Sequence, residues 1–253
     1  MSIYDFLKKS LLKAGRCTKK MNPYPFLKKY FTFLMQYFNY KKKSNEILRI
    51  SDLYPCFNDA TNSTPFDPHY FYQSAWVSAK IAESKVNFHV DVGSQIYLIA
   101  PLSGFIKVLF VDIRKLEAAL PNLECIKGSI INLPFDDKSV SSISSLHVVE
   151  HIGLGRYGDE IDPLGAKKAC KELQRVLSDD GNLYISVPVG RERVKFNAHR
   201  IFNPFTIIKY FDELSLFDFG CVDDSGKYYR KYKVEDCASF YYGLGLFHFR
   251  RNA

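Results

Sequence analysis

The sequence has few of the features that fix a protein class at once. Its six cysteines are scattered and form no CxxC pair, which predicts reduced thiols rather than a disulfide framework. It has no HExxH motif or other fixed spacing of metal ligands. The apolar stretch at residues 30–40 is shorter than the roughly 20 residues of a membrane-spanning helix. Lysines interrupt the apolar residues at the N-terminus, whereas a cleavable signal peptide has an uninterrupted apolar run there. These absences predict a globular, cytoplasmic protein.

Acidic residues are scarce at the N-terminus. Residues 1–50 hold two Asp/Glu against twelve Lys/Arg, whereas the rest of the chain has 25 acidic and 23 basic residues. The basic character therefore belongs to the leader. This asymmetry predicts a basic, aromatic, helical appendage over residues 1–50, a polar linker over 51–65 and one globular domain over 66–253.

The leader predicts two amphipathic helices, over residues 2–14 and from residue 26 to about residue 40. Two interpretations of residues 1–43 stay open: helices packed on the globular domain with a solvated lysine face, and helices lying on an anionic membrane surface. Aromatic and basic residues can also bind nucleic acid, but no nucleic-acid motif accompanies them, so we expect no nucleic-acid partner.

The rest of the chain alternates predicted strands and helices. Strands are expected at residues 86–93, 107–113, 123–128, 139–149 and 182–189, with helices at 67–84, 166–177 and 203–211. Two late strands, at 217–222 and 240–249, are expected to form a hairpin. This order predicts an α/β, Rossmann-like, mostly parallel sheet with helices on both faces. The single tryptophan, Trp76, is expected to anchor the core.

Residues 145–162 gather most of the polar chemistry. This stretch follows a predicted buried strand, where ligands bind in open α/β sheets. Its polar side chains are His147, Glu150, His151, Arg156, Asp159 and Asp162. A second pattern, Asp91 and Gly93 at the end of one strand and Asp112 at the end of the next, is typical of nucleotide binding.

The segments HVDVGS, VDIR, NLPFDDKSVSSISSLHVVEHI and KELQRVLSDDGNLYISVP resemble the class I S-adenosylmethionine-dependent methyltransferases over residues 86–190. Together with SVPVGRER and FNAHR, the chain from 66 to 250 resembles DUF268, an uncharacterised family placed in that superfamily. The resemblance implies a seven-stranded sheet with an antiparallel edge and S-adenosylmethionine as cofactor. It implies cofactor contacts by Asp91, Gly93, Ser94, Asp112, Ser129 and Leu146, with Asp112 on the ribose and Ser129 beside Ile130 at the adenine position.

The first motif departs from the family's Gly-x-Gly-x-Gly pattern. Gly93 is followed by Ser94, Gln95, Ile96 and Tyr97, and Tyr97 is expected to crowd a cofactor. A non-catalytic binding module on the same fold is therefore an alternative function.

Methyl transfer to a hydroxyl needs an aligned acceptor and a base. The predicted catalytic residues are His147, Glu150, His151 and His199, with Glu150 or Asp159 orienting a histidine ring. Four arginines surround the same edge: Arg156, Arg191, Arg193 and Arg200. Their guanidinium groups suit an anionic substrate such as a sugar phosphate or an acidic glycan. The predicted substrate-binding residues are Arg156, Asp159, Asp162, Arg191 and Arg200.

We therefore predict methyl transfer to a hydroxyl of a sugar or of a surface-polysaccharide precursor. A metal-dependent enzyme is the other alternative. Its ligands would come from His147, His151, Asp159, Asp162 and His199.

Overall fold

The computed structural model describes residues 24–251, in two compact units divided after Pro65. The first predicted helix of the leader lies outside the described residues.

The first unit is built on helix α2 (Tyr24–Lys43), which is followed by the single turn η1 (Ile50–Asp52). Tyr30 is buried on one face of α2, where it contacts Phe57 with ring centroids 5.9 Å apart. Another face exposes apolar side chains at helical spacing: Leu27, Phe31, Met35 and Phe38. The helix has five lysines and no acidic residue. It is thus amphipathic and basic, as the sequence predicts.

None of the helices in residues 24–251 combines the length and hydropathy needed to cross a membrane.

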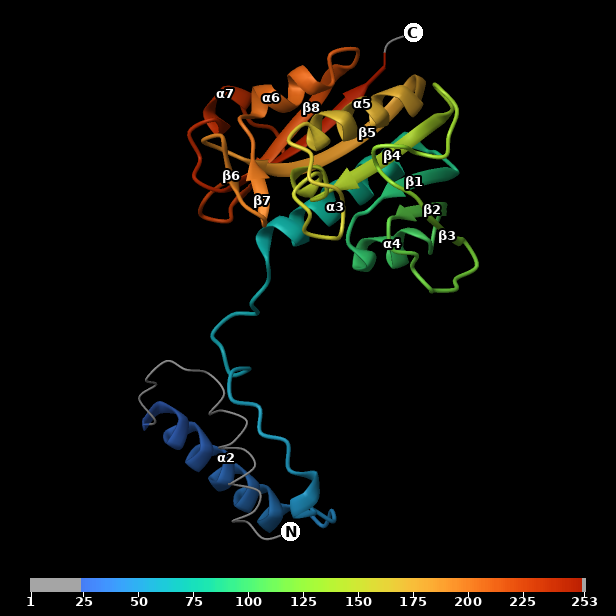
Figure 1. Cartoon of the computed structure of the whole chain (residues 1–253). Helices are drawn as coiled ribbons and strands as arrows, with labels where there is room; N and C mark the ends of the chain where they lie inside the picture. The colour runs from blue at the N-terminus through green and yellow to red at the C-terminus, as the bar shows by residue number, and fades with distance from the viewer. Residues whose placement is uncertain (1–23, 252–253) are drawn as a thin grey trace. The chain divides into compact units, whose positions relative to one another are not determined.

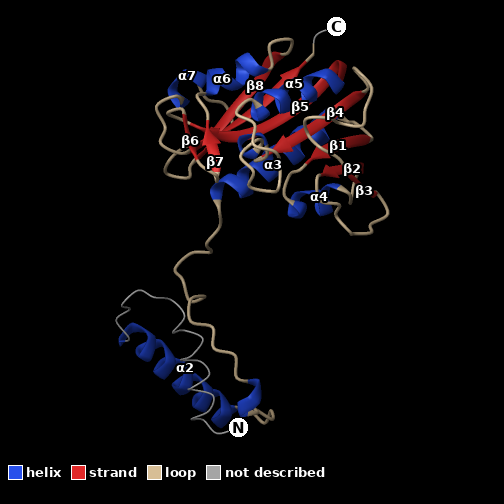
Figure 2. Ribbon diagram, viewed as in Figure 1, coloured by secondary structure: helices blue, strands red, loops and turns tan. Residues whose placement is uncertain are grey.

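The second unit contains one large sheet (Figure 2). Its strands follow the order β3-β2-β1-β4-β5-β10-β8-β9. Its first five strands are parallel: β3 (Leu123–Lys127), β2 (Lys107–Asp112), β1 (Phe88–Val92), β4 (Val140–Leu146) and β5 (Leu177–Val189). The antiparallel edge follows, with β10 (Gly243–Arg250) between β5 and β8 (Ser215–Val222).

The predicted α/β sheet and the pairing of its two late strands are confirmed. The expected number of seven strands is too low by one. Tyr228 and Tyr229 form a two-residue strand, β9, against the end of β8. Two residues carry too short an alternation to be recognised in a sequence.

Helices and short elements surround the sheet (Figure 1). They are α3 (Pro68–Ser84), α4 (Ile96–Leu102), η2 (Val149–His151), α5 (Gly165–Val176), α6 (Pro204–Tyr210) and α7 (Val234–Cys237). A separate two-stranded ribbon pairs β6 (Arg193–Lys195) with β7 (His199–Ile201).

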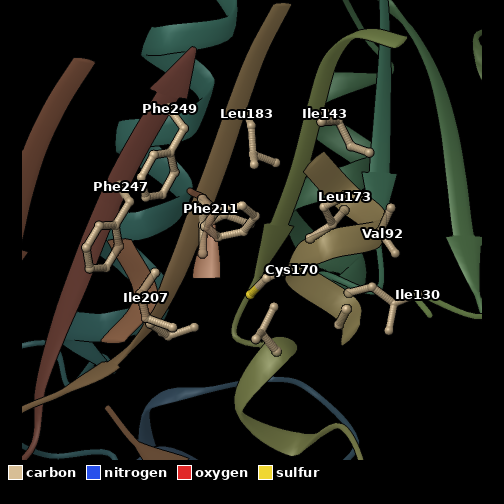
Figure 3. Packing of buried hydrophobic residues seen from close by; sticks show 14 of the residues in the cluster. Val92, Ile130, Ile143, Cys170, Leu173, Leu183, Ile207, Phe211, Phe247 and Phe249 are labelled. Carbon is tan, nitrogen blue, oxygen red and sulfur yellow. The ribbon is translucent and has the colours of Figure 1, made fainter. Parts of the chain in front are cut away.

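The buried apolar residues form two clusters. One gathers side chains of α5 and α6 with strand residues, including Cys170, Leu173 and Ile207 (Figure 3). The other joins α3 and α4 to the sheet and includes Trp76, which is 4% exposed, so its predicted place in the core is confirmed. Each fully buried large side chain contributes about 1.5–3 kcal/mol. This packing fixes the sheet, and with it the positions of the residues at the carboxyl ends of its strands.

The order of strands reverses between β1 and β4. The chain proceeds outward from β1 through β2 to β3, and then returns to the other side of β1 with β4. At such a switch point the loops after neighbouring strands turn in opposite directions and leave a crevice at the carboxyl ends of the strands. Asp91, Asp112 and Leu146 lie at or next to the carboxyl ends of β1, β2 and β4.

Candidate active site

A cleft of about 610 Å³ opens at the carboxyl ends of β1, β2 and β4. Its walls come from the loop after β1, the start of α4, the end of β2 and the loop after β4. The predicted site residues among those that line it are Gly93, Ser94, Asp112, Leu146, His147 and His151. The structure therefore brings together residues that lie up to 58 positions apart in the chain.

Asp91 lies behind the cleft rather than in it. Its carboxylate is fully buried and accepts hydrogen bonds from the Ser144 hydroxyl, the Ser94 hydroxyl (2.7 Å) and the Ser94 N–H (3.0 Å). Burial raises the pKa of Asp91 to about 6, although these hydrogen bonds oppose the rise. The predicted direct contact with the cofactor is corrected: Asp91 holds the loop whose next residues line the cleft.

Gly93 and Ser94 fix the shape of the loop after β1. Gly93 has a φ of +73°, and a Cβ there would lie 3.2 Å from a methyl carbon of Val148. The Ser94 hydroxyl donates to Asp91 and accepts the N–H of Leu146 (3.0 Å). Ser94 stands at a variable position of the Gly-x-Gly-x-Gly pattern, and its hydroxyl ties the loop after β1 to the ends of β1 and β4. The two absent glycines fall at Gln95 and Tyr97.

Asp112 ends β2 with its side chain 15% exposed in the wall of the cleft. Its Oδ1 accepts the N–H of Arg114 at 2.8 Å. Asp112 also borders a narrower slot of about 100 Å³ that has apolar walls, among them Ile113, Ile130 and Val148. A carboxylate at the mouth of an apolar slot suits a ligand with hydroxyl groups next to a flat ring.

Ser129 precedes Ile130 but does not line either the cleft or the slot. Its hydroxyl accepts the N–H of Ile131 at 3.5 Å. The structure thus gives no ligand contact to Ser129, and the apolar Ile130 lines the slot instead.

Tyr97 does not fill the cleft. Its side chain lies at the rim and is 82% exposed, because α4 begins at Ile96 and carries Tyr97 on its outer side. Gln95 is held at the edge, where its amide donates to the Ser74 hydroxyl at 3.0 Å. The expected crowding by Tyr97 is wrong.

His147 and Glu150 form a buried pair beside the cleft. The distance from His147 Nδ1 to Glu150 Oε1 is 2.6 Å, and the two side chains are 6% and 0% exposed. Although burial raises the pKa of Glu150, the charge and hydrogen bond of His147 lower it below that of an ordinary glutamate. Among the described residues, no group bonds His147 Nε2. The geometry fixes one ring nitrogen of His147 as donor to Glu150 and leaves the other able to accept a proton.

His151 also lines the cleft, and its ring lies near the same oxygen of Glu150 as the ring of His147. Its Nδ1 lies 2.7 Å from the carbonyl oxygen of Ala198 and must donate to it, so Nε2 is the basic nitrogen of the neutral ring. That Nε2 is 3.8 Å from Glu150 Oε1. Burial lowers the pKa of His151, so the ring is neutral at pH 7.

His199 lies behind His151 and does not line the cleft. Its ring centroid is 6.4 Å from that of His151 and 5.2 Å from that of Tyr242. Burial and the charge of Lys195 lower the pKa of His199. The structure therefore gives it a supporting position, not the direct catalytic contact predicted from the sequence.

Arg200 is not available to a substrate. Its buried guanidinium donates from Nη1 to the backbone oxygens of Ile152 (2.6 Å) and Glu150 (3.4 Å). The side chain pins η2, the turn that carries His151 and Glu150. The predicted substrate contact is corrected to a role in positioning.

The other predicted substrate ligands also serve the protein itself. The carboxylate of Asp159 accepts hydrogen bonds from the N–H groups of Gly153 (2.7 Å) and Tyr157 (3.2 Å). The carboxylate of Asp162 accepts a hydrogen bond from the N–H of Leu164 and forms an ion pair with Lys168. Arg156 is exposed and donates to the Ala198 oxygen at 2.9 Å. Arg191 is exposed outside the cleft.

Three aromatic residues were missed by the sequence analysis: His69 and Tyr70 at the start of α3, and Tyr242 before β10. The His69 ring stacks on Tyr242 (5.2 Å between centroids) and on His147 (5.6 Å). Asp67-Pro68 is a recognisable helix start, since Asp67 caps α3 by accepting the N–H of His69. The sequence contains no indication that this start packs against the loop after β4.

Among residues 24–251, no group of three His, Cys, Asp or Glu side chains converges as a metal site would require. The metal alternative fails because Asp159 and Asp162 bind backbone groups of their own loop and His199 lies behind His151.

Comparison with known proteins supports the fold. Residues 132–219 match the family described as "Caenorhabditis protein of unknown function, DUF268", a range that includes His147, Glu150 and His151. No curated protein matches the chain.

Many solved structures are similar, and two of them illustrate the match. One is the N-methyltransferase NodS from Bradyrhizobium japonicum in complex with S-adenosyl-L-homocysteine, at 10% identity and a TM-score of 0.53 over 78% of this chain and 93% of that one. The other is the [4+2]-cyclase SpnF, at 13% identity and a TM-score of 0.51 over 70% and 80%. The predicted family resemblance is confirmed: this chain has the class I methyltransferase fold, and its residues 132–219 match the DUF268 family.

Proposed function

We propose that this protein is an S-adenosylmethionine-dependent methyltransferase that acts on a hydroxyl of a sugar or of a surface-polysaccharide precursor. The observation that carries the proposal is the cleft at the carboxyl ends of β1, β2 and β4. It has Asp112 in its wall and the His147–Glu150 pair at its edge. NodS, which shares the fold, is an N-methyltransferase in complex with S-adenosyl-L-homocysteine.

The residues of the cleft fit an adenosyl group. Asp112 can accept hydrogen bonds from ribose hydroxyls, and the slot beside Ile113, Ile130 and Val148 can hold the adenine. Gly93 lets the backbone approach the ligand because it has no side chain. When bound, S-adenosylmethionine supplies a methyl group on an electrophilic sulfonium.

The His147–Glu150 pair can take the proton that a hydroxyl acceptor must lose. Glu150 holds Nδ1 of His147 as the donor, so Nε2 is the nitrogen that receives the proton. The buried carboxylate then stabilises the imidazolium. His151, with its Nδ1 bound to Ala198, is the second candidate base. A base positioned in this way typically accelerates a reaction by about 10²–10⁴-fold.

A transfer assay tests this function. The full chain is incubated with methyl-labelled S-adenosylmethionine and a panel of sugars and glycosides, and S-adenosylhomocysteine formation is measured. We expect turnover with at least one acceptor. In Glu150→Gln the rate of methyl transfer should fall by about 10²–10⁴-fold, whereas the affinity for S-adenosylhomocysteine should not change. Binding of S-adenosylhomocysteine without turnover on any acceptor would favour a non-catalytic binding module.

We also propose that the basic leader associates the protein with an anionic membrane surface on the cytoplasmic side. The support is the exposed apolar stripe of α2, Leu27, Phe31, Met35 and Phe38, with one lysine pair near the start of the helix and one lysine triplet at its end. Apolar side chains at the headgroup boundary and lysines near anionic lipids both favour such a position.

A further inference from the structure

A second cavity, of about 360 Å³, adjoins the cleft. Tyr70 and His147 line both hollows, so the cavity begins where the proposed cofactor site ends. Its other walls come from the start of α3, the turn at residues 223–226 and Tyr242. The cavity meets the cleft at the proposed base, which is where an acceptor would have to enter.

Aromatic rings form one wall of this cavity. His69 is stacked between His147 and Tyr242, with interplanar angles of 16° and 24°. Burial, with a smaller effect from His147, lowers the pKa of His69 to about 4, so the ring is neutral at pH 7. Neutral aromatic side chains with a few polar groups among them are typical walls of small-molecule sites.

The carboxylates that line the cavity are not balanced by any lysine or arginine among the described residues of its lining. They belong to Asp67, Asp223 and Asp224. Asp223 Oδ1 accepts the N–H groups of Ser225 (2.9 Å) and Lys227 (3.0 Å). Although burial raises the pKa of Asp223, these and other hydrogen bonds lower it overall, so the group is ionised at neutral pH. Carboxylates accept hydrogen bonds from hydroxyls and repel phosphate and carboxylate groups.

His147 supplies an observation that is independent of the acidic residues. Its side chain is 6% exposed, and its Nε2 has no hydrogen-bond partner among the described residues. A buried polar atom without a partner is costly. His147 lines both hollows, and its nearly inaccessible Nε2 would gain a partner where a ligand hydroxyl displaces a neighbouring ring at their junction.

From these observations we infer that the second cavity is the acceptor site and that it selects an uncharged, polyhydroxylated acceptor, a sugar without phosphate or carboxylate. The inference rests on the proposed function and narrows its substrate class. It replaces the anionic substrate expected from the sequence, because Arg156, Arg191 and Arg200 do not line the cavity.

The test is saturation-transfer NMR on the full chain with saturating S-adenosylhomocysteine. The probes are the methyl glycosides of glucose, galactose and mannose, with glucose 6-phosphate and glucuronate as charged probes. We expect saturation transfer to at least one methyl glycoside and none to the charged probes. Equal transfer to the charged probes, or no transfer to any methyl glycoside, would overturn the inference.

A blocking variant locates the binding. Ser225 is exposed at the turn that lines the cavity and does not line the cleft, so Ser225→Trp should fill the cavity and leave the cleft open. We expect at least tenfold weaker glycoside binding in Ser225→Trp, unchanged binding in the control Ser225→Ala, and the same S-adenosylhomocysteine affinity in both. Unchanged glycoside binding in Ser225→Trp would refute the location. Failure of the proposed function would appear differently, as no S-adenosylhomocysteine binding to the wild-type chain, or as binding without turnover in the transfer assay.

Discussion

Replacing Arg200 by methionine separates a structural arginine from a substrate ligand. The guanidinium is buried and donates to the backbone oxygens of Ile152 and Glu150. A hydrogen bond to a charged group contributes about 1.5–3 kcal/mol, and the longer of the two bonds adds less. Methionine fills part of the volume but leaves both carbonyls without their donor. We therefore expect Arg200→Met to lose about 2–4 kcal/mol of the free energy of unfolding.

Urea unfolding followed by the fluorescence of the buried Trp76 measures this loss. With a slope of about 2 kcal/mol/M, the midpoint should fall by about 1–2 M. The matched control is Arg191→Met, the same substitution at an exposed arginine, which should change stability by less than about 0.5 kcal/mol. If Arg200→Met is as stable as the wild type and only weakens acceptor binding, Arg200 is a substrate ligand and our account of it is wrong.

Three further changes have defined outcomes. Gly93→Ala forces a positive φ on a residue with a Cβ that meets Val148, so it should lose about 1–2 kcal/mol in urea unfolding and bind S-adenosylhomocysteine more weakly in calorimetry. Burial lowers the pKa of His89 to about 3, so its neutral form stabilises the fold above pH 6.5 and this contribution falls as the pH drops. Between pH 7 and pH 5 the free energy of unfolding, measured with urea, should therefore fall by about 2 kcal/mol more in the wild type than in His89→Leu. An equal fall in the two proteins would show that His89 is not held neutral by burial. Phe31→Ser should weaken sedimentation of the full chain with phosphatidylserine vesicles, whereas Tyr54→Ser, at another exposed aromatic residue, should not.

The sequence predicts the platform of the site well. β2 is an apolar run that ends at Asp112, β1 alternates apolar with polar residues, and β4 combines three apolar residues with four serines. The parallel order brings the carboxyl ends of these strands together. Asp112 in the cleft wall and His147 at its edge follow from that order. These positions depend on strand periodicity and topology, which the sequence carries directly.

The partners of polar side chains could not be predicted in the same way. Arg200 and Asp159 bind backbone groups, and a backbone oxygen or N–H has no identity in the sequence. The direction of the Tyr97 side chain could not be predicted because it depends on where α4 begins. His69 and Tyr242 reach the site through packing between elements more than 150 residues apart, which spacing along the chain cannot reveal.

In our proposal, the cleft at the carboxyl ends of β1, β2 and β4 binds an adenosyl group through Asp112. Isothermal titration of the full chain with S-adenosylhomocysteine tests it most directly, with Asp112→Ala as the comparison and circular dichroism as the check on folding. We predict binding at one site and, from the lost charge-assisted hydrogen bonds, an affinity at least tenfold weaker in a folded Asp112→Ala. No heat of binding at millimolar ligand, or an equal affinity in the two proteins, would contradict the account.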